Sequence, residues 1–281
     1  KRAKTTGRGA LKIVLNDVMQ HGVHPHVRDV SRASYDAGGP KSIRKLINYY
    51  NLVLIMNNCN VKLGLKGHVY DNGYSILKNK GLAIVWMSVG NSYFKKEGID
   101  NLIKCVNDKF SKIRILIPNE PAEHTYKALG YDVKTAKKKA RLNSNRMKNH
   151  TQRAIDSLSK KSDFKIIDWD VDIIPKEEYK KSLIFVKDLY DNNADFRKDA
   201  RETTEEVLKG KIKETVKMDK AIDAGVKYLI EELAFVIASP NLFKVKNTAY
   251  VYHREWPIFE KLVNGVYDSE PKKSLGFLLI K

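Results

Sequence analysis

The apolar run at residues 82–87 is the feature that most constrains how this chain folds. The run is rich in branched and aromatic side chains, follows Gly81 and ends before Gly90, so it predicts a buried strand rather than a helix. The next periodic segment, residues 99–106, predicts a helix. Ser88 is therefore expected at the carboxyl end of a strand in an open α/β sheet, which is where such sheets bind their ligands.

Strand and helix patterns alternate along the rest of the chain. Such alternation is typical of a mostly parallel sheet covered by helices. The predicted fold class is therefore α/β, a Rossmann-like, mostly parallel sheet flanked by helices. The predicted strands are 82–88, 113–118, 164–167, 243–251 and 275–280, and the predicted helices are 98–110, 121–130, a long basic helix from 133, 176–191, 195–215 and 218–238.

Residues 1–75 differ from this pattern because they are basic and repeatedly interrupted. Helices are predicted at 10–20 and 41–57, with breakers at Pro25 and at Gly38-Gly39-Pro40 between them. These features predict a basic helical N-terminal extension, followed by the main domain at 76–281. A helix-turn-helix is an alternative that the pattern leaves open.

The composition of the chain points to an anionic partner. Its 281 residues include 52 Lys and Arg against 33 Asp and Glu, a formal net charge of +19. An excess of this size favours nucleic acid first and a membrane surface second. There is no apolar run of membrane-spanning length. The two cysteines, Cys59 and Cys105, lack metal-ligand spacing and predict a reducing, cytoplasmic setting without a disulfide framework.

The positive charge is concentrated after Val133. Ten Lys or Arg residues lie between Val133 and Lys161, and Asp156 is the one acid among them. A solvated helix face is the simplest explanation, but such faces usually mix charges of both signs. A membrane-surface helix would carry large apolar side chains, whereas the apolar stripe here is mostly small. The segment therefore favours a nucleic-acid backbone.

Ser88 alone does not decide the function, because a serine at a strand end often only caps a turn. The Gly-x-Ser-x-Gly motif of α/β-hydrolases requires glycine where this chain has Trp86, so that class is disfavoured. Tyr228 and Glu232, four residues apart, share one face of an otherwise apolar helix. A buried carboxylate there needs either a protein cation or a cationic ligand.

Three dispersed motifs together resemble the cyclodipeptide synthases over about residues 80 to 280. They are Ser88-x-x-Asn91, Tyr228-x-x-x-Glu232 and Tyr252-His253, with Trp256-Pro257 after the last. Asn91 and Tyr252-His253 resemble the subfamily that is defined by those residue types. The resemblance implies a fold similar to the catalytic domain of class I tyrosyl- and tryptophanyl-tRNA synthetases, without use of ATP.

The resemblance also implies an aminoacyltransferase that converts two aminoacyl-tRNAs into a 2,5-diketopiperazine through an aminoacyl group bound to Ser88. Tyr228 and Glu232 would bind the α-ammonium group and carry protons, and Asn91, Tyr252 and His253 would complete the catalytic site. The expected substrate-binding residues are Ile84, Trp86, Gly90, Phe235 and Tyr250. The expected tRNA-binding residues are Lys137, Lys138, Lys139, Arg141, Arg146, Lys148 and Arg153.

The chain departs from the family pattern in two ways. Residues 1–75 are longer than the lead-in of typical bacterial members, and the bulky Trp86 stands where a small residue leaves room for the first aminoacyl side chain. With Phe235 and Tyr250, Trp86 predicts a small or compact first residue; the alternative is that the Trp86 side chain turns into the core. No metal or cofactor is expected, and nothing resembles a dimer seam, so a monomer is expected. Two alternatives stay open: a non-catalytic tRNA-binding protein, and a transferase with a different acceptor.

Overall fold

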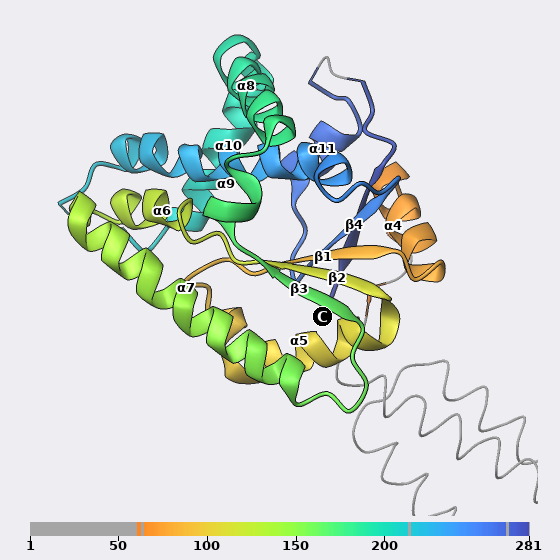
Figure 1. The fold of residues 1–281 in the computed structure, drawn as a ribbon. Coiled ribbons are helices and arrows are strands. Elements are labelled where there is room, and N and C mark those ends of the chain that lie inside the picture. The colour runs from red at the N-terminus through yellow and green to blue at the C-terminus, as the bar shows by residue number, and fades with distance from the viewer. Residues whose placement is uncertain (1–60, 63–64, 213–214, 268–269, 281) are drawn as a thin grey trace, which may run out of the picture. The chain divides into compact units, whose positions relative to one another are not determined.

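Five parallel strands form the centre of the computed structural model, which describes residues 61–62, 65–212, 215–267 and 270–280. In the sheet they are ordered β3-β2-β1-β4-β5 (Figure 1). This arrangement confirms the predicted α/β fold class, a parallel sheet flanked by helices. The strands are β1 Leu82–Trp86, β2 Lys112–Leu116, β3 Asp163–Ile167, β4 Thr248–Tyr252 and β5 Leu275–Leu279.

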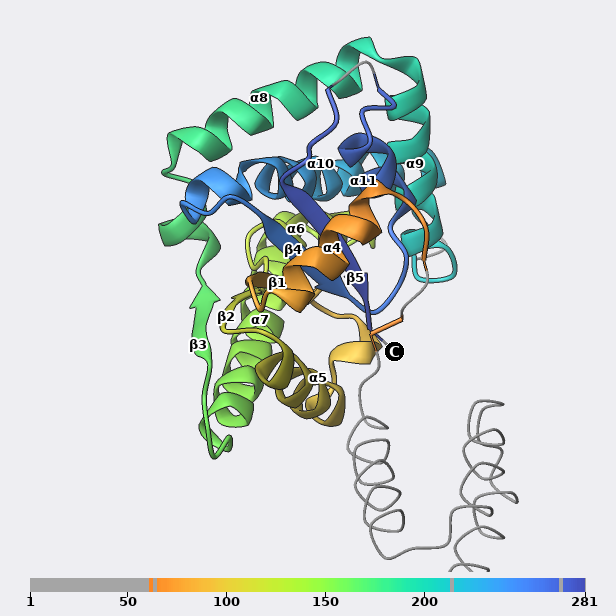
Figure 2. The same cartoon turned by 90° about the vertical axis from the view of Figure 1, so that its right-hand side faces the viewer.

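Helices connect the strands and cover both faces of the sheet. In Figure 1, α5 and α7 lie on one face, and α10 and α11 lie on the other. Seen from the side in Figure 2, α8 and α9 form a further layer beyond α10. The helices are α4 His68–Lys78, α5 Lys96–Lys109, α6 Ala122–Ala128, α7 Val133–Asp156, α8 Glu177–Asn192, α9 Ala194–Leu208, α10 Met218–Leu242 and α11 Pro257–Val263, with short helices η1 Ser92–Phe94 and η2 Trp169–Ile173.

The burial of each strand follows from its place in the sheet. Every residue of β1 and β4 is buried, because both strands have neighbours on each side and helices on each face. The edge strand β3 is instead buried only at Ile167. The other edge strand, β5, is buried throughout because α4 packs on it. β1 and β4 therefore provide a rigid, dry base for the residues at their carboxyl ends.

Helix α4 belongs to the same body as the sheet. A Cβ atom added to Gly73 would lie 2.3 Å from the carbonyl oxygen of Phe277, and one added to Gly276 would lie 2.5 Å from the Gly73 nitrogen. Only glycine permits so close an approach of two backbones. Residues 68–75 therefore lie in helix α4 beside the sheet, whereas the sequence analysis assigned residues up to 75 to the extension. The predicted helices at 10–20 and 41–57 lie outside the described residues.

Helix α10 continues to Leu242, beyond its predicted end at 238, and β4 begins only at Thr248. Pro240 is tolerated within α10 because the carbonyl of Val236, which a Pro240 N–H would have bonded, has other donors. The Ser239 hydroxyl donates to this carbonyl at 2.9 Å, and the Tyr250 hydroxyl lies 3.4 Å from it. The sequence analysis ended the helix too early because it did not anticipate these donors.

Two further expectations differ from the structure. Helix α9 ends at Leu208 rather than 215. Cys105, on α5, is disulfide-bonded, although the cysteine count had predicted no disulfide. None of the described helices has the length and apolar character needed to cross a membrane.

Candidate active site

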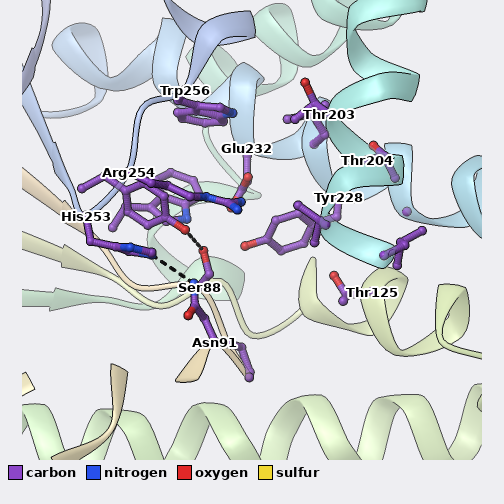
Figure 3. Close-up of a pocket in the computed structure, with 18 of the residues that line it drawn as sticks. Ser88, Asn91, Thr125, Thr203, Thr204, Tyr228, Glu232, His253, Arg254 and Trp256 are labelled. Carbon is purple, nitrogen blue, oxygen red and sulfur yellow. Dashed lines mark hydrogen bonds between the residues drawn. The ribbon is translucent and has the colours of Figure 1, made fainter. Parts of the chain in front are cut away.

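Ser88 lies two residues beyond the end of β1, and its side chain meets the end of the neighbouring strand β4. The Ser88 and Tyr252 hydroxyl oxygens are 2.9 Å apart and hydrogen-bonded (Figure 3). They meet because β1 and β4 are parallel neighbours, so their carboxyl ends lie at the same edge of the sheet. Gly90, with φ at 83°, turns the chain directly after Ser88.

Asn91 holds this turn against the end of β4. Its side-chain nitrogen lies 3.0 Å from Nε2 of His253, and its side-chain oxygen accepts a hydrogen bond from the backbone N–H of Tyr93. The Tyr93 ring stacks on the His253 ring at a centroid distance of 4.2 Å. Burial, and then the positive charge of Arg254, lower the pKa of His253 to about 4. His253 is therefore a neutral hydrogen-bonding partner at physiological pH.

Tyr228 and Glu232 come from the buried face of α10 and approach the same space from the opposite side (Figure 3). Within the described part of the chain, neither the Tyr228 hydroxyl nor Oε1 of Glu232 has a hydrogen-bond partner. Burial raises the pKa of Glu232 to about 8, and the nearby Tyr228 hydroxyl and Trp86 indole, followed by the positive charge of Arg254, offset part of that rise. A buried carboxylate without a partner is costly, so this pair suits a ligand that brings a cation.

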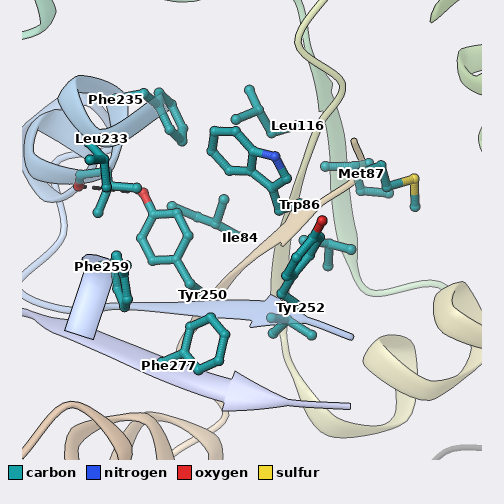
Figure 4. Packing of buried hydrophobic residues seen from close by; sticks show 14 of the residues in the cluster. Ile84, Trp86, Met87, Leu116, Leu233, Phe235, Tyr250, Tyr252, Phe259 and Phe277 are labelled. Atoms are coloured by element: carbon teal, nitrogen blue, oxygen red, sulfur yellow. Dashed lines mark hydrogen bonds between the residues drawn. The ribbon is translucent and has the colours of Figure 1, made fainter. Parts of the chain in front are cut away.

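A cavity of about 500 Å³ joins these groups. Its wall includes all six predicted catalytic residues and three of the five predicted substrate-binding residues, namely Trp86, Gly90 and Tyr250. The other two, Ile84 and Phe235, are fully buried and do not line the cavity. The structure instead places them in the core behind Trp86 and Tyr250 (Figure 4).

Aromatic rings close one end of the cavity. The Trp86 indole lies 5.8 Å from the Phe235 ring and 6.0 Å from the Trp256 ring, measured between centroids. Only 4% of the Trp86 surface is exposed. The indole therefore both packs into the core and forms part of the cavity wall. Both of the placements considered in the sequence analysis, in the pocket wall and in the core, apply to Trp86.

Several residues of the cavity wall were not predicted from the sequence. Arg254 follows Tyr252-His253 directly, so its position beside a strand end was a usable signal. Trp256 had been noted only as part of a motif. For the residues from α6 and α9 there was no such signal, because their helical patterns show no feature that points to a cavity. The unpredicted lining residues include Thr125, Tyr126, Thr203, Lys211, Arg254 and Trp256.

The predicted tRNA-binding residues all lie on α7, but they differ in exposure. Lys148 is ion-paired with Asp168 at 2.9 Å, so its charge is already neutralised within the protein. Lys139 is partly buried and lies 4.6 Å above the Tyr131 ring. The remaining five residues, Lys137, Lys138, Arg141, Arg146 and Arg153, are exposed.

Comparison with known proteins shows the family. A family model described as "Cyclodipeptide synthase" matches residues 69–281. The chain belongs to the cyclodipeptide synthase family. This membership confirms the function that the three motifs had predicted, an enzyme that forms cyclic dipeptides.

Curated members of the family are distant relatives of this synthase. A cyclo(L-leucyl-L-leucyl) synthase of Bacillus subtilis is 24% identical over 216 residues, which cover 75% of this chain and 86% of the relative. Another, of Photorhabdus laumondii, is 26% identical over 212 residues, which cover 72% and 90%. At this level of identity, the amino acids that this synthase uses are inferred from its own pocket.

Solved structures share the fold of this synthase. The crystal structure of a cyclodipeptide synthase from Bacillus thermoamylovorans has a TM-score of 0.71 at 22% identity and covers 81% of this chain and 98% of its own. A Mycobacterium tuberculosis protein has a TM-score of 0.63 at 17% identity, with coverage of 74% and 88%. That structure is described as demonstrating that cyclodipeptide synthetases are related to type I tRNA synthetases.

Proposed function

We propose that this synthase joins the aminoacyl groups of two aminoacyl-tRNAs, with Ser88 as the nucleophile. The observation that carries the proposal is the joint placement of four groups in one cavity. The Ser88 hydroxyl is hydrogen-bonded to Tyr252, and Tyr228 and Glu232 lie opposite with polar atoms that have no partner among the described residues. An aminoacyl ester is already activated, so a serine held in this way needs no Ser-His-Asp triad.

In the proposed first step, the Ser88 Oγ attacks the ester carbon of the first aminoacyl-tRNA. The bond to the ribose oxygen breaks, and the proton from Ser88 leaves with the tRNA through the hydroxyl of Tyr252. The amine of the bound residue then attacks the ester carbon of the second aminoacyl-tRNA and releases the second tRNA. Finally, the new terminal amine attacks the ester carbon on Ser88, which closes the diketopiperazine ring and frees Ser88.

Tyr228 and Glu232 have a role in each of these steps. The α-ammonium group of the bound residue supplies the cation that Glu232 lacks in the described structure. That ammonium favours the ionised form of Glu232, and it must lose a proton before its nitrogen can attack. A carboxyl whose pKa burial raises to about 8 is then basic enough to accept this proton. The Tyr228 hydroxyl, four residues away on the same helix face, can donate to the carboxylate or relay the proton.

Asn91, Tyr252 and His253 support assignment to the subfamily that is defined by those residue types. Their hydrogen bonds join the turn after β1 to the end of β4. The exposed cations of α7 are proposed to bind the tRNA backbone. Because charged tRNA is the substrate, we place the reaction in the cytoplasm, with the enzyme acting as a monomer.

The aromatic end of the cavity supports the proposal that the first amino acid is small or compact. Trp86, Tyr250 and Trp256 all line the cavity with Ser88, and their bulky rings occupy space that smaller side chains would leave open. A product profile dominated by pairs of large aromatic residues would contradict this assignment.

The covalent role of Ser88 is tested by mass spectrometry of bacteria that express the chain or its Ser88→Ala variant. The unmodified chain should release diketopiperazines into the medium, and its intact mass should increase by one aminoacyl group when it is mixed with charged tRNA. Both signals should vanish in Ser88→Ala. Full synthesis by that variant would exclude Ser88 as the nucleophile.

A further inference from the structure

The cavity wall carries more positive charge than its one carboxylate can balance. Of the residues that line it, only Lys211, Glu232 and Arg254 have side chains that carry charge near neutral pH. His253 is neutral, and burial favours the protonated form of Glu232 until a cation binds beside it. No carboxylate among the described residues forms an ion pair with Arg254 or Lys211. The cavity is therefore suited to a ligand with an anionic group.

Arg254 is the cation that lies beside the reaction centre. Its guanidinium carbon is 5.9 Å from the centroid of the Tyr252 ring, and the Tyr252 hydroxyl is bonded to Ser88. Figure 3 shows the Arg254 side chain extending from the end of β4 toward Glu232. The two are close enough for the arginine to lower the pKa of the carboxyl, but they form no ion pair. The fork of the guanidinium is free to bind a carboxylate with two hydrogen bonds.

We propose that Arg254 is a specificity-determining residue that selects an amino acid with a carboxylate side chain, aspartate or glutamate, as one of the two residues of the cyclic product. This inference rests on the proposed function. An aspartyl or glutamyl group brings two charges to the cavity. Its α-ammonium group complements Glu232, and its side-chain carboxylate complements Arg254.

The phosphates of tRNA are the other anionic groups of the substrate. A side-chain carboxylate lies only a few bonds from the ester carbon that Ser88 attacks, whereas the nearest phosphate lies beyond the ribose. Arg254 lies close to the reaction centre, because its guanidinium group is near the ring of Tyr252, whose hydroxyl contacts Ser88. The tRNA backbone also has the exposed cations of α7 to neutralise it. The position of Arg254 therefore favours the side chain of the amino acid over the phosphate.

The test compares two substrates that differ only in the side chain. The tRNA for glutamine is charged with either glutamate or glutamine, and the tRNA for asparagine with either aspartate or asparagine. Each is mixed with the purified enzyme and a pool of other aminoacyl-tRNAs, and products are measured by mass spectrometry. For at least one pair, the unmodified enzyme should incorporate the acidic residue about tenfold or more in preference to its amide, because a charge-assisted bond is lost with the amide.

Variants of the enzyme then test whether the preference for the acidic residue depends on Arg254. Arg254→Met keeps the length of the side chain and should bring the ratio close to one while synthesis from neutral residues continues. Arg254→Lys should keep part of the preference. Lys187→Met, at an exposed position on α8 away from the cavity, should leave it unchanged.

Three outcomes oppose the inference in distinguishable ways. Synthesis without any preference for the acidic residue would overturn it and leave the proposed function intact. An equal loss of all substrates in Arg254→Met, with a weaker salt dependence of tRNA binding, would assign Arg254 to a phosphate. The absence of diketopiperazine with every charged tRNA would instead refute the proposed function itself.

Discussion

The hydroxyl oxygens of Ser88 and Tyr252 lie 2.9 Å apart, although 164 positions separate the two residues in the chain. The contact exists because β1 and β4 are neighbours at the centre of the sheet and end at the same edge. Burial raises the pKa of Tyr252, and its bond to Ser88 and the charge of Arg254 lower it only in part. Tyr252 therefore stays protonated and can donate to Ser88 or relay its proton.

Removal of the Tyr252 hydroxyl should slow the first acyl transfer. We expect Tyr252→Phe to reduce the rate about 100-fold, the lower range for loss of a positioned proton carrier. The rate is measured as the appearance of the aminoacyl-enzyme by rapid-quench mass spectrometry. Tyr179→Phe is a control because it removes a tyrosine hydroxyl from α8, outside the cavity wall. A loss of less than threefold in Tyr252→Phe would remove Tyr252 from the proton pathway.

Glu232 should make the stability of the protein depend on pH. Its pKa is about 8 in the folded protein against an ordinary value of 4.5. Between these values the folded state keeps a proton that the unfolded state releases, so stability falls as pH rises, by up to about 1.4 kcal/mol per pH unit. Below pH 4.5 both states are protonated and the full contribution is present.

Glu232→Gln removes this titration. The variant should lose synthesis, and its melting temperature should fall less between pH 5.5 and 8.5 than that of the unmodified protein. Differential scanning calorimetry at several pH values measures the difference. Glu206→Gln, at an exposed position on α9, should retain the original pH dependence. Parallel curves for Glu232→Gln and the unmodified protein would show that Glu232 is ionised throughout this range.

Asn91 should stabilise the turn after β1 as well as the site. Asn91→Ala loses the bond to His253 and the cap on the Tyr93 N–H. We expect a cost of about 1–2 kcal/mol, typical of a lost cap and hydrogen bond. Urea unfolding measures this cost, with Asn101→Ala, on the exposed face of α5, as the control. Equal midpoints for the two variants would contradict the structural role.

The exposed face of α7 should determine how tRNA binding responds to salt. Changing Lys138 and Arg141 to glutamate should weaken binding at least tenfold and lower the slope of log affinity against log salt, by about 0.7–0.9 per lost phosphate contact. Filter binding at several salt concentrations gives both values. Changing Lys181 and Lys187 on α8 alters the net charge equally and should have a much smaller effect. Similar losses in both double variants would indicate a diffuse field rather than a binding face.

Trp86 should limit the size of one residue of the product. Trp86→Leu shortens the aromatic wall, and it should shift the products toward larger residues and lower stability by about 2–4 kcal/mol through the space left in the core. Product masses and the unfolding midpoint are measured on the same variant. An unchanged profile with the expected loss of stability would assign Trp86 to packing alone.

The sequence predicted the parts of this site that lie at strand ends or on one helix face. Ser88, Asn91, Tyr252 and His253 follow apolar strands, and the spacing of Tyr228 and Glu232 gives them a common face on α10. Ile84 was expected in the cavity wall because it shares a strand face with Trp86 and Ser88, and Phe235 because its position resembles the pocket wall of the family. Both are instead buried in the core, because a shared face or position does not show how much of the space neighbouring rings fill.

Other features of the structure depend on contacts between segments that are distant in the sequence, and no local sequence pattern indicates such contacts. The end of α10 was misplaced because Pro240 is tolerated only through donors that include Tyr250 from β4. Lys148 looked like the other cations of α7 because its partner Asp168 lies 20 positions further along the chain. Helix α4 joins the sheet through Gly73 and Gly276, two small residues that carry no periodic signal.

The location of β1 between β2 and β4 also affects how the enzyme loses activity on heating. Central strands of a buried sheet exchange their amide hydrogens only when the whole domain opens. Ser88 is attached to such a strand, and Tyr252 ends the strand beside it. Local fraying at the periphery cannot separate the two hydroxyls, so thermal inactivation of the acylation step and cooperative melting of the domain should be one event with one midpoint.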